Sequence, residues 1–143
     1  MTGPGHADRV RALLDAWNRD DFGALGAFSA ADVSFDPPPG WPESASAHSR
    51  EEMLRQFAIL KEPWESERVE IQSLEEHGAR VLCHFSWHTR GRSSAIDAVY
   101  EMWAVCSFHG ESITRLSIHW DRDAALEAMA ESPARRMQDA AEE

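Results

Sequence analysis

The sequence predicts one α+β domain in which helices cover one face of a curved antiparallel sheet. Three observations support this fold class. Residues 79–120 form three long segments in which apolar and polar residues alternate, separated by short turns at 91–94 and 109–111. Apolar residues at helical spacing precede these segments. A chain of 143 residues also has the size of a single domain with one core.

The first part of the chain is expected to form two helices and a short strand. Apolar residues recur at i, i+3, i+4 and i+7 over residues 10–17, which is typical of one face of a helix. A second, shorter helix follows over residues 22–28, with Asp20 or Asp21 as its N-cap. Apolar residues then alternate over residues 33–35, which predicts a brief strand.

A proline-rich loop and a third helix are expected next. Three consecutive prolines at 37–39 stop regular structure because each removes a backbone donor and fixes φ. Ser49 and Glu52 have the spacing of a capping box, and Pro63 ends the helix that they begin. The loop over residues 37–49 is rich in Gly, Pro and Ser, and we expect it to form a flap over an opening.

The remaining strands are predicted to form an antiparallel meander. The expected turns place Met102 near Cys83 and Ile118, and Tyr100 near Phe85 and Trp120. Successive side chains of a strand point to opposite faces of the sheet. One face is therefore apolar, and helices are needed to cover it. This face is expected to comprise Cys83, Phe85, Trp87, Ile96, Ala98, Tyr100, Met102, Ala104, Leu116, Ile118 and Trp120. Helices do not completely fill the space enclosed by a curved sheet, so a pocket is expected between them and the sheet.

The ends of the chain complete the predicted organisation. Asp121 is expected to cap a last helix, with Leu126 and Met129 on its inner side. We therefore predict a flexible N-terminus over residues 1–7, one domain over 8–131 and a flexible tail over 132–143.

Charge and composition restrict the partners and the location. A net charge of −11 argues against binding to nucleic acid or to an anionic membrane surface, since both need a basic patch. The N-terminus has no apolar signal segment, and no apolar run approaches about 18 residues. We expect a cytoplasmic protein. Cys83 and Cys106 both lie in apolar strand segments, which predicts buried free thiols.

Four segments, taken in order, resemble the NTF2-like superfamily and in particular its SnoaL-like branch. They are residues 16–20, 28–37, 49–57 and 113–121, and the resemblance extends over about residues 8–130. It implies a cone-shaped fold with a largely apolar pocket, and frequently a dimer formed through the outer face of the sheet. The superfamily includes steroid isomerases, polyketide cyclases, epoxide hydrolases and binding modules without catalysis, so the fold does not give the function.

Asp36 is the candidate general base. It precedes Pro37 at the end of the first strand, and the resemblance places it where the steroid isomerase branch carries its base. A carboxyl group at the mouth of an apolar pocket has a raised pKa, which suits proton transfer beside a carbonyl. Its alternative role is to start the proline loop as an Asx-turn. Two positions weigh against related enzymes: the isomerase tyrosine corresponds to Ala12, and an acid of the epoxide hydrolases corresponds to Ile118.

Two further polar residues and a set of apolar ones complete the candidate site. Tyr100 could donate its hydroxyl to a ligand oxygen, or bond to the backbone within the core. His48, in the flap, could act as an acid or base, or be a solvated loop histidine. The expected walls of the ligand pocket are Trp17, Trp41, Phe57, Phe85, Trp87, Met102, Ile118 and Trp120.

The outer face of the sheet is the candidate dimer interface. The expected registers place His84, Glu101 and His119 in one row across three strands, with Trp103 on the same face. His84 and His88 are about 13 Å apart along a strand, too far to bind one metal ion together. Cross-strand pairing inside a homodimer is favoured over a metal site, because Trp103 would otherwise be exposed.

Two functions remain open from the sequence. The first is a cofactor-free isomerase, cyclase or dehydratase that acts on a hydrophobic, ring-containing carbonyl compound with Asp36 as base. The second is a non-catalytic module for ligand binding or dimerisation. They differ in whether Asp36 faces the cavity together with a second polar group that could hold an oxyanion.

Overall fold

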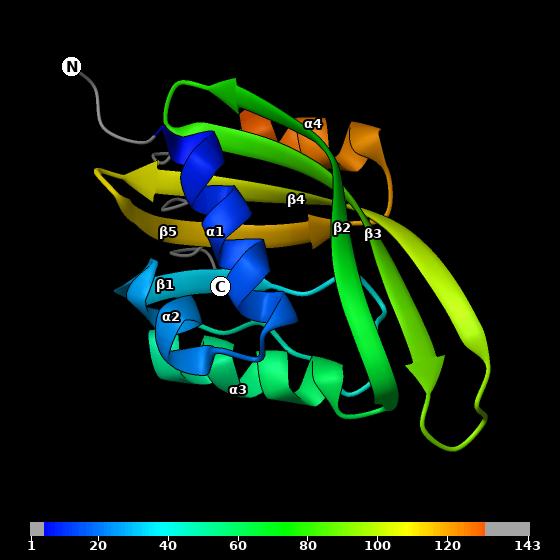
Figure 1. The fold of residues 1–143 in the computed structure, drawn as a ribbon. Coiled ribbons are helices and arrows are strands. Elements are labelled where there is room, and N and C mark those ends of the chain that lie inside the picture. Colours follow the sequence, from blue (N-terminus) through cyan, green and yellow to red (C-terminus); the bar gives the residue numbers. More distant parts are fainter. Residues whose placement is uncertain (1–4, 131–143) are drawn as a thin grey trace.

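The structure is a computed structural model, and it describes residues 5–130 (Figure 1). The elements, in chain order, are α1 (His6–Asn18), α2 (Phe22–Ala27), β1 (Ser29–Asp36), α3 (Arg50–Lys61), β2 (Trp64–His77), β3 (Arg80–Gly91), β4 (Asp97–His109), β5 (Ser112–His119) and α4 (Arg122–Ala130). The predicted α+β architecture is confirmed.

The five strands form one mixed sheet in the order β1-β5-β4-β3-β2. Strands β2 to β5 are consecutive antiparallel neighbours, as the short turns predict. Strand β1 pairs with β5 in parallel, so the sheet is not antiparallel throughout. After β1 the chain crosses through α3 to β2 at the opposite edge of the sheet, so β1 and its neighbour β5 are far apart in the sequence.

The register of the long strands differs from the prediction by two residues. Met102 lies opposite Phe85, and Ala104 lies opposite both Cys83 and Ile118. A shift of two residues leaves every side chain on its predicted face, because the period of a strand is two. One member of the predicted inner face is wrong: Ile96 lies in the β3–β4 turn, before the strand begins, and is 65% exposed.

The helices lie on both sides of the sheet, not on one side as expected. Figure 1 shows α1 across the inner face and α4 behind the sheet. Strand β2 bends at two register shifts and β5 departs from β4 at a third, and such irregularities help the sheet to curve around α1. Helix α1 packs on β2 and β3, and α3 packs on β1.

Helix α4 covers part of the outer face because that part is apolar. Leu82 and Val105 are buried there against Ala125, with Met129 packed beside them. The prediction that Leu126 points inward is wrong, since its side chain is 39% exposed. The buried side of the helix follows Ala125 and Met129, which are one turn apart.

The predicted helix starts are confirmed. The Asp21 side chain accepts a hydrogen bond from Ala24 N, and the Asp121 side chain accepts one from Ala124 N. At α3, Ser49 Oγ accepts from Glu52 N at 3.2 Å. The Glu52 carboxylate accepts from the backbone of the residue before Ser49, so the capping box spans one residue more than its usual form.

Part of the predicted flexible N-terminus is helical. Helix α1 starts at His6, whose ring stacks on Phe108 with 4.3 Å between centroids. The rest of the predicted flexible ends, residues 1–4 and the tail over 132–143, lies outside the described residues. Within residues 5–130, no helix is both long and apolar enough to cross a membrane.

Candidate functional site: an apolar cavity inside the sheet

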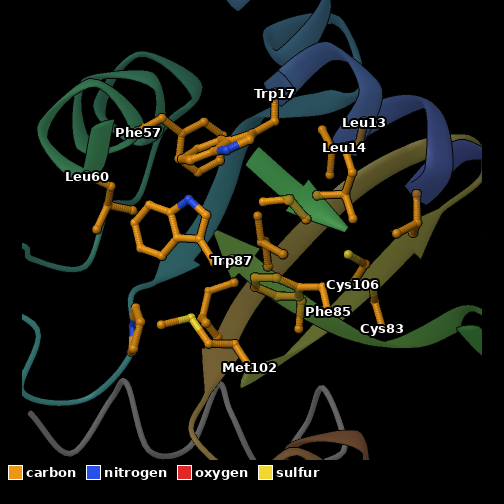
Figure 2. Close-up of a pocket in the computed structure, with 16 residues that line it drawn as sticks. Leu13, Leu14, Trp17, Phe57, Leu60, Cys83, Phe85, Trp87, Met102 and Cys106 are labelled. Carbon is orange, nitrogen blue, oxygen red and sulfur yellow. The ribbon is translucent and has the colours of Figure 1, made fainter. Parts of the chain in front are cut away.

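A cavity of about 70 Å³ lies between α1, α3 and the inner face of the sheet (Figure 2). The side chains that line it are apolar throughout. They are Val10, Leu13, Leu14, Trp17, Pro38, Phe57, Leu60, Val69, Cys83, Phe85, Trp87, Met102, Ala104, Cys106, Leu116 and Ile118. Figure 2 shows the rings of Trp17, Phe57 and Trp87 gathered at one end and the two cysteines at the other.

The sequence identified most of the aromatic wall. Six of the eight residues predicted to contact a ligand line the cavity: Trp17, Phe57, Phe85, Trp87, Met102 and Ile118. Trp17 is the centre of this wall, with Phe57 at 5.2 Å and Trp87 at 6.3 Å between ring centroids, both edge-on. Such edge-to-face pairs stabilise one arrangement of the rings, so the shape of the wall is well defined.

The cavity is small for a ring-containing ligand. At about 70 Å³ it has roughly half the ~150 Å³ of an engineered apolar cavity that binds benzene. Pockets for drug-sized ligands are larger still, at about 300–1,000 Å³. A ligand with even one ring therefore requires that part of the wall move.

Both cysteines are apolar parts of the cavity wall. Cys83 and Cys106 are free and buried, as predicted. Burial raises the pKa of the Cys83 thiol to about 12, and it also raises the pKa of Cys106. Both side chains are therefore protonated thiols near neutral pH, and a protonated buried thiol is a poor nucleophile.

Glu67 is an inner carboxylate that the sequence analysis missed. Its Oε1 accepts hydrogen bonds from Nε1 of Trp17 at 2.6 Å and from Nε1 of Trp87 at 2.8 Å. Its Oε2 pairs with Lys61 Nζ at 2.7 Å, and both side chains of this ion pair are about nine-tenths buried. Glu67 therefore holds two aromatic walls of the cavity in place. The available signal was its position two residues before Val69, which puts it on the inner face of β2.

Asp36 does not line the cavity. On β1 the side chain of Phe35 points into the core, and Asp36, the next residue, lies on the opposite face. Its Oδ1 accepts a hydrogen bond from Ser46 at 2.8 Å, and its Oδ2 pairs with Arg115 at 3.1 Å. The expectation that Asp36 overlooks the cavity is corrected by this alternation, because the residue that faces inward at this end of β1 is apolar.

The other candidate polar residues also lie away from the cavity wall. His48 is exposed, at the end of the loop before α3. Tyr100 belongs to a group of rings that also contains the two remaining predicted contact residues. We call this group the aromatic cluster; its members are Trp41, Trp64, Trp87, Tyr100 and Trp120. The cluster meets the cavity at Trp87, which belongs to both.

The predicted row on the outer face contains Trp103 in place of Glu101. Trp103 lies opposite His84 on one side and His119 on the other. The rings of His84 and Trp103 stack with 4.4 Å between centroids. Glu101 accepts hydrogen bonds from Ser86 and pairs with His84 at 3.0 Å, and the Ser86 bond is the main cause that lowers the pKa of Glu101. The face thus carries paired polar groups around Trp103, which is less exposed than the sequence predicted because it packs against the apolar cluster under α4.

The chain matches one family model. Residues 10–116 match the model of the SnoaL-like domain, which is well over half of the chain. No curated protein matches the chain at a significant level.

Solved structures share the fold at low sequence identity. An NTF2-like protein of unknown function from Burkholderia pseudomallei K96243 is 17% identical, with a TM-score of 0.75, over 90% of this chain and 100% of that chain. A hypothetical protein with a ketosteroid isomerase-like fold from Catenulispora acidiphila, in complex with trimethylamine, is 22% identical with a TM-score of 0.71, over 84% and 88%. An LEH-like epoxide hydrolase from M. tuberculosis is 16% identical with a TM-score of 0.67, over 81% and 82%. These similarities show a common fold.

Proposed function

Because the chain belongs to the SnoaL-like domain family, we propose that it is a binding protein that encloses a small hydrophobic molecule in its apolar cavity. The observation that carries this proposal is the composition of the wall, in which every lining residue is apolar. Burying apolar surface supplies about 25 cal/mol per Å² of free energy without directional partners. A wall of this kind favours an apolar ligand and penalises a polar one.

The polar groups near the cavity support binding over catalysis. A general base must come within hydrogen-bond reach of the proton that it removes. The carboxylate of Asp36 is on the other face, paired with Arg115. The carboxylate of Glu67 reaches the wall, but both of its oxygens accept bonds from Trp17, Trp87 and Lys61. Among the described residues, the lining itself contains no carboxylate, imidazole or amine.

The hypothesis of an enzyme depended on Asp36 as the base. Because Asp36 lies away from the cavity, the structure supports catalysis less than it supports binding. The Catenulispora protein was solved with trimethylamine, which supports the general idea that this fold can hold a small molecule. The M. tuberculosis epoxide hydrolase shares the fold with this chain at 16% identity. Hydrolysis of an epoxide needs polar groups that activate water and protonate the ring oxygen, whereas the lining here consists of hydrocarbon, indole, thiol and thioether groups.

The experiment is a thermal-shift screen of small apolar compounds of increasing size, measured on the wild type and on Ala104→Leu. Ala104 lines the cavity on β4, so the larger side chain fills it. Compounds that raise the Tm of the wild type should lose this effect in Ala104→Leu, since a ligand stabilises only the state that binds it. Val99→Leu is the control, because Val99 is exposed on the same strand. Equal shifts in the wild type and in Ala104→Leu would refute binding in the cavity.

A further inference from the structure

We propose that Trp41 is a plug, and that the place of its indole ring is a binding subsite for a flat aromatic ring that carries a hydrogen-bond acceptor. This inference rests on the proposed function and extends it, because it names the ligand class and the part of the wall that moves. The subsite lies beside the cavity and shares Trp87 with it.

The indole of Trp41 contacts all four other rings of the aromatic cluster. The distances between ring centroids are 5.2 Å to Tyr100, 5.4 Å to Trp87, 5.8 Å to Trp120 and 6.4 Å to Trp64. The Trp120 ring is stacked on it and the Tyr100 ring meets it edge-on. These are the two arrangements that aromatic rings prefer. The four rings thus form a receptor for one planar ring.

The receptor and the plug come from different parts of the structure. Trp64, Trp87 and Tyr100 lie on β2, β3 and β4, and Trp120 directly follows β5, so the receptor is built on the sheet. Trp41 lies in the loop between β1 and α3. A plug on a loop can leave a receptor on a sheet without breaking any strand pairing. The hydrogen bond from Trp120 Nε1 to Pro39 O, at 2.7 Å, ties the loop to the receptor beside the plug.

The loop turns sharply around the plug, and one non-glycine residue adopts a left-handed backbone conformation there. Gly40 has φ of +79° and Glu43 has φ of +62°. A side chain other than glycine is disfavoured in the left-handed region, by about 1 kcal/mol or more. The end of the loop is held independently of the plug, by hydrogen bonds from Ala45 N to Gln56 and from Ser46 to Asp36, so the ring of Trp41 could leave while this end stays in place.

A buried donor indicates what the ligand carries. Nε1 of Trp64 is buried and has no hydrogen-bond partner among the described residues. The indole donors of Trp17, Trp87 and Trp120 all have acceptors. A buried donor without an acceptor costs free energy, and an acceptor on the ligand would recover that cost. A ketone on a fused ring combines a flat aromatic surface with an acceptor.

The first test uses 1-indanone as probe and Trp41→Ala as the variant that removes the plug. The receptor is then open, so Trp41→Ala should bind 1-indanone about tenfold or more tightly than the wild type, in which the plug competes for the site. Trp103→Ala is the matched control, because it removes an indole stacked on His84 on the outer face. If 1-indanone stabilises Trp41→Ala no more than Trp103→Ala, the receptor does not exist and the proposal is wrong.

The second test addresses the acceptor. Indane has the same fused rings as 1-indanone and lacks the carbonyl group. In the Trp41→Ala background 1-indanone should bind more tightly than indane, and adding Trp64→Phe should remove that preference while indane still binds. A preference that is unchanged by Trp64→Phe would overturn the role of the buried donor.

A third measurement covers the case in which Trp41→Ala does not fold. In the wild type, 1-indanone should accelerate hydrogen exchange at the amide of Trp41, which donates to Pro38 O at 3.1 Å in the closed loop. Binding without faster exchange at this amide would show that the plug stays in place, and would overturn the proposal. Ala104→Leu separates the two sites: it should abolish binding in the cavity and leave the tight binding of 1-indanone to Trp41→Ala. If no compound binds in the cavity, the proposal of a subsite at Trp41 can therefore still be tested on its own.

Discussion

Nη2 of Arg115 lies 3.1 Å from Oδ2 of Asp36, and this ion pair joins the end of β1 to the middle of its parallel neighbour β5 on the outer side of the sheet. The side chains are 20% and 40% exposed, so water partly screens the attraction between them. The hydroxyl of Ser46 bonds to the other oxygen of Asp36 and so anchors the end of the loop that carries Trp41. This arrangement explains an acidic residue before the prolines without a catalytic role.

The substitution Asp36→Asn should have a small effect on stability and none on ligand binding. The partly exposed pair is worth about 1 kcal/mol at most, which lowers Tm by a few degrees in a domain of this size. Asn can still accept the bond from Ser46. Thermal melts with and without the best compound from the screen measure both quantities. If Asp36→Asn folds normally and loses all ligand stabilisation, Asp36 belongs to the site after all.

The buried ion pair of Glu67 and Lys61 should contribute far more to the stability of the fold than the pair of Asp36 and Arg115. The substitution Glu67→Ala leaves the Lys61 charge without its closest partner and removes the acceptor of both Trp17 and Trp87. Breaking a buried pair by removing one partner costs about 3–5 kcal/mol. Urea denaturation measures the loss. Glu70→Ala is the control, since Glu70 is half-exposed on the same strand and should change stability by about 0.5 kcal/mol or less. Similar losses for the two variants would contradict the proposed role of Glu67.

The buried thiols predict how stability changes in alkaline solution. Burial raises the pKa of Cys83 from about 9 to about 12 in the folded protein, whereas an unfolded thiol ionises near pH 8.5. The unfolded state thus loses protons first, and the free energy of unfolding decreases as the pH rises from about 8.5 towards 12. Other groups titrate in this window, so the comparison is with Cys83→Ala/Cys106→Ala. The double variant should show a shallower decrease, and an identical pH dependence would contradict the burial of the thiols.

The outer face gives a prediction about assembly. Trp103 lies in the middle of the row formed with His84 and His119, and Val99 on the same face is 56% exposed. We expect a homodimer through this face at micromolar concentration, and Trp103→Glu should convert it to a monomer by placing a charge against its symmetry mate. Sedimentation velocity measures both, with Ala27→Glu on α2 as a control that stays dimeric. A monomeric wild type would refute the expectation.

The sequence predicted the fold well because its signals were periodic and local. The alternation in β3 to β5 fixed which side chains face inward, and a register error of two residues did not change this. Capping residues and prolines marked the ends of the helices. Helix α4 was placed on the wrong side, because two apolar residues on the outer face, Leu82 and Val105, were not recognised as the surface on which it packs.

The site was predicted less well because it depends on contacts between distant residues. Most of the aromatic wall could be named, since large apolar residues on the inner face point to one place. The roles of Asp36 and Glu67 were not foreseen. The resemblance directed attention to Asp36, whereas the two tryptophans that donate to Glu67 lie 50 and 20 residues away from it in the sequence. No local pattern shows that Trp41 enters a ring of four aromatic side chains.

Binding of an apolar ligand in the cavity can be observed in a crystal structure of the protein soaked with the compound that gives the largest thermal shift. We expect electron density for the compound inside the cone, enclosed by Cys83, Phe85 and Met102 or extending past Trp87 into the place of the Trp41 ring. Density beside Asp36 and Arg115, with the cavity unchanged, would contradict this expectation.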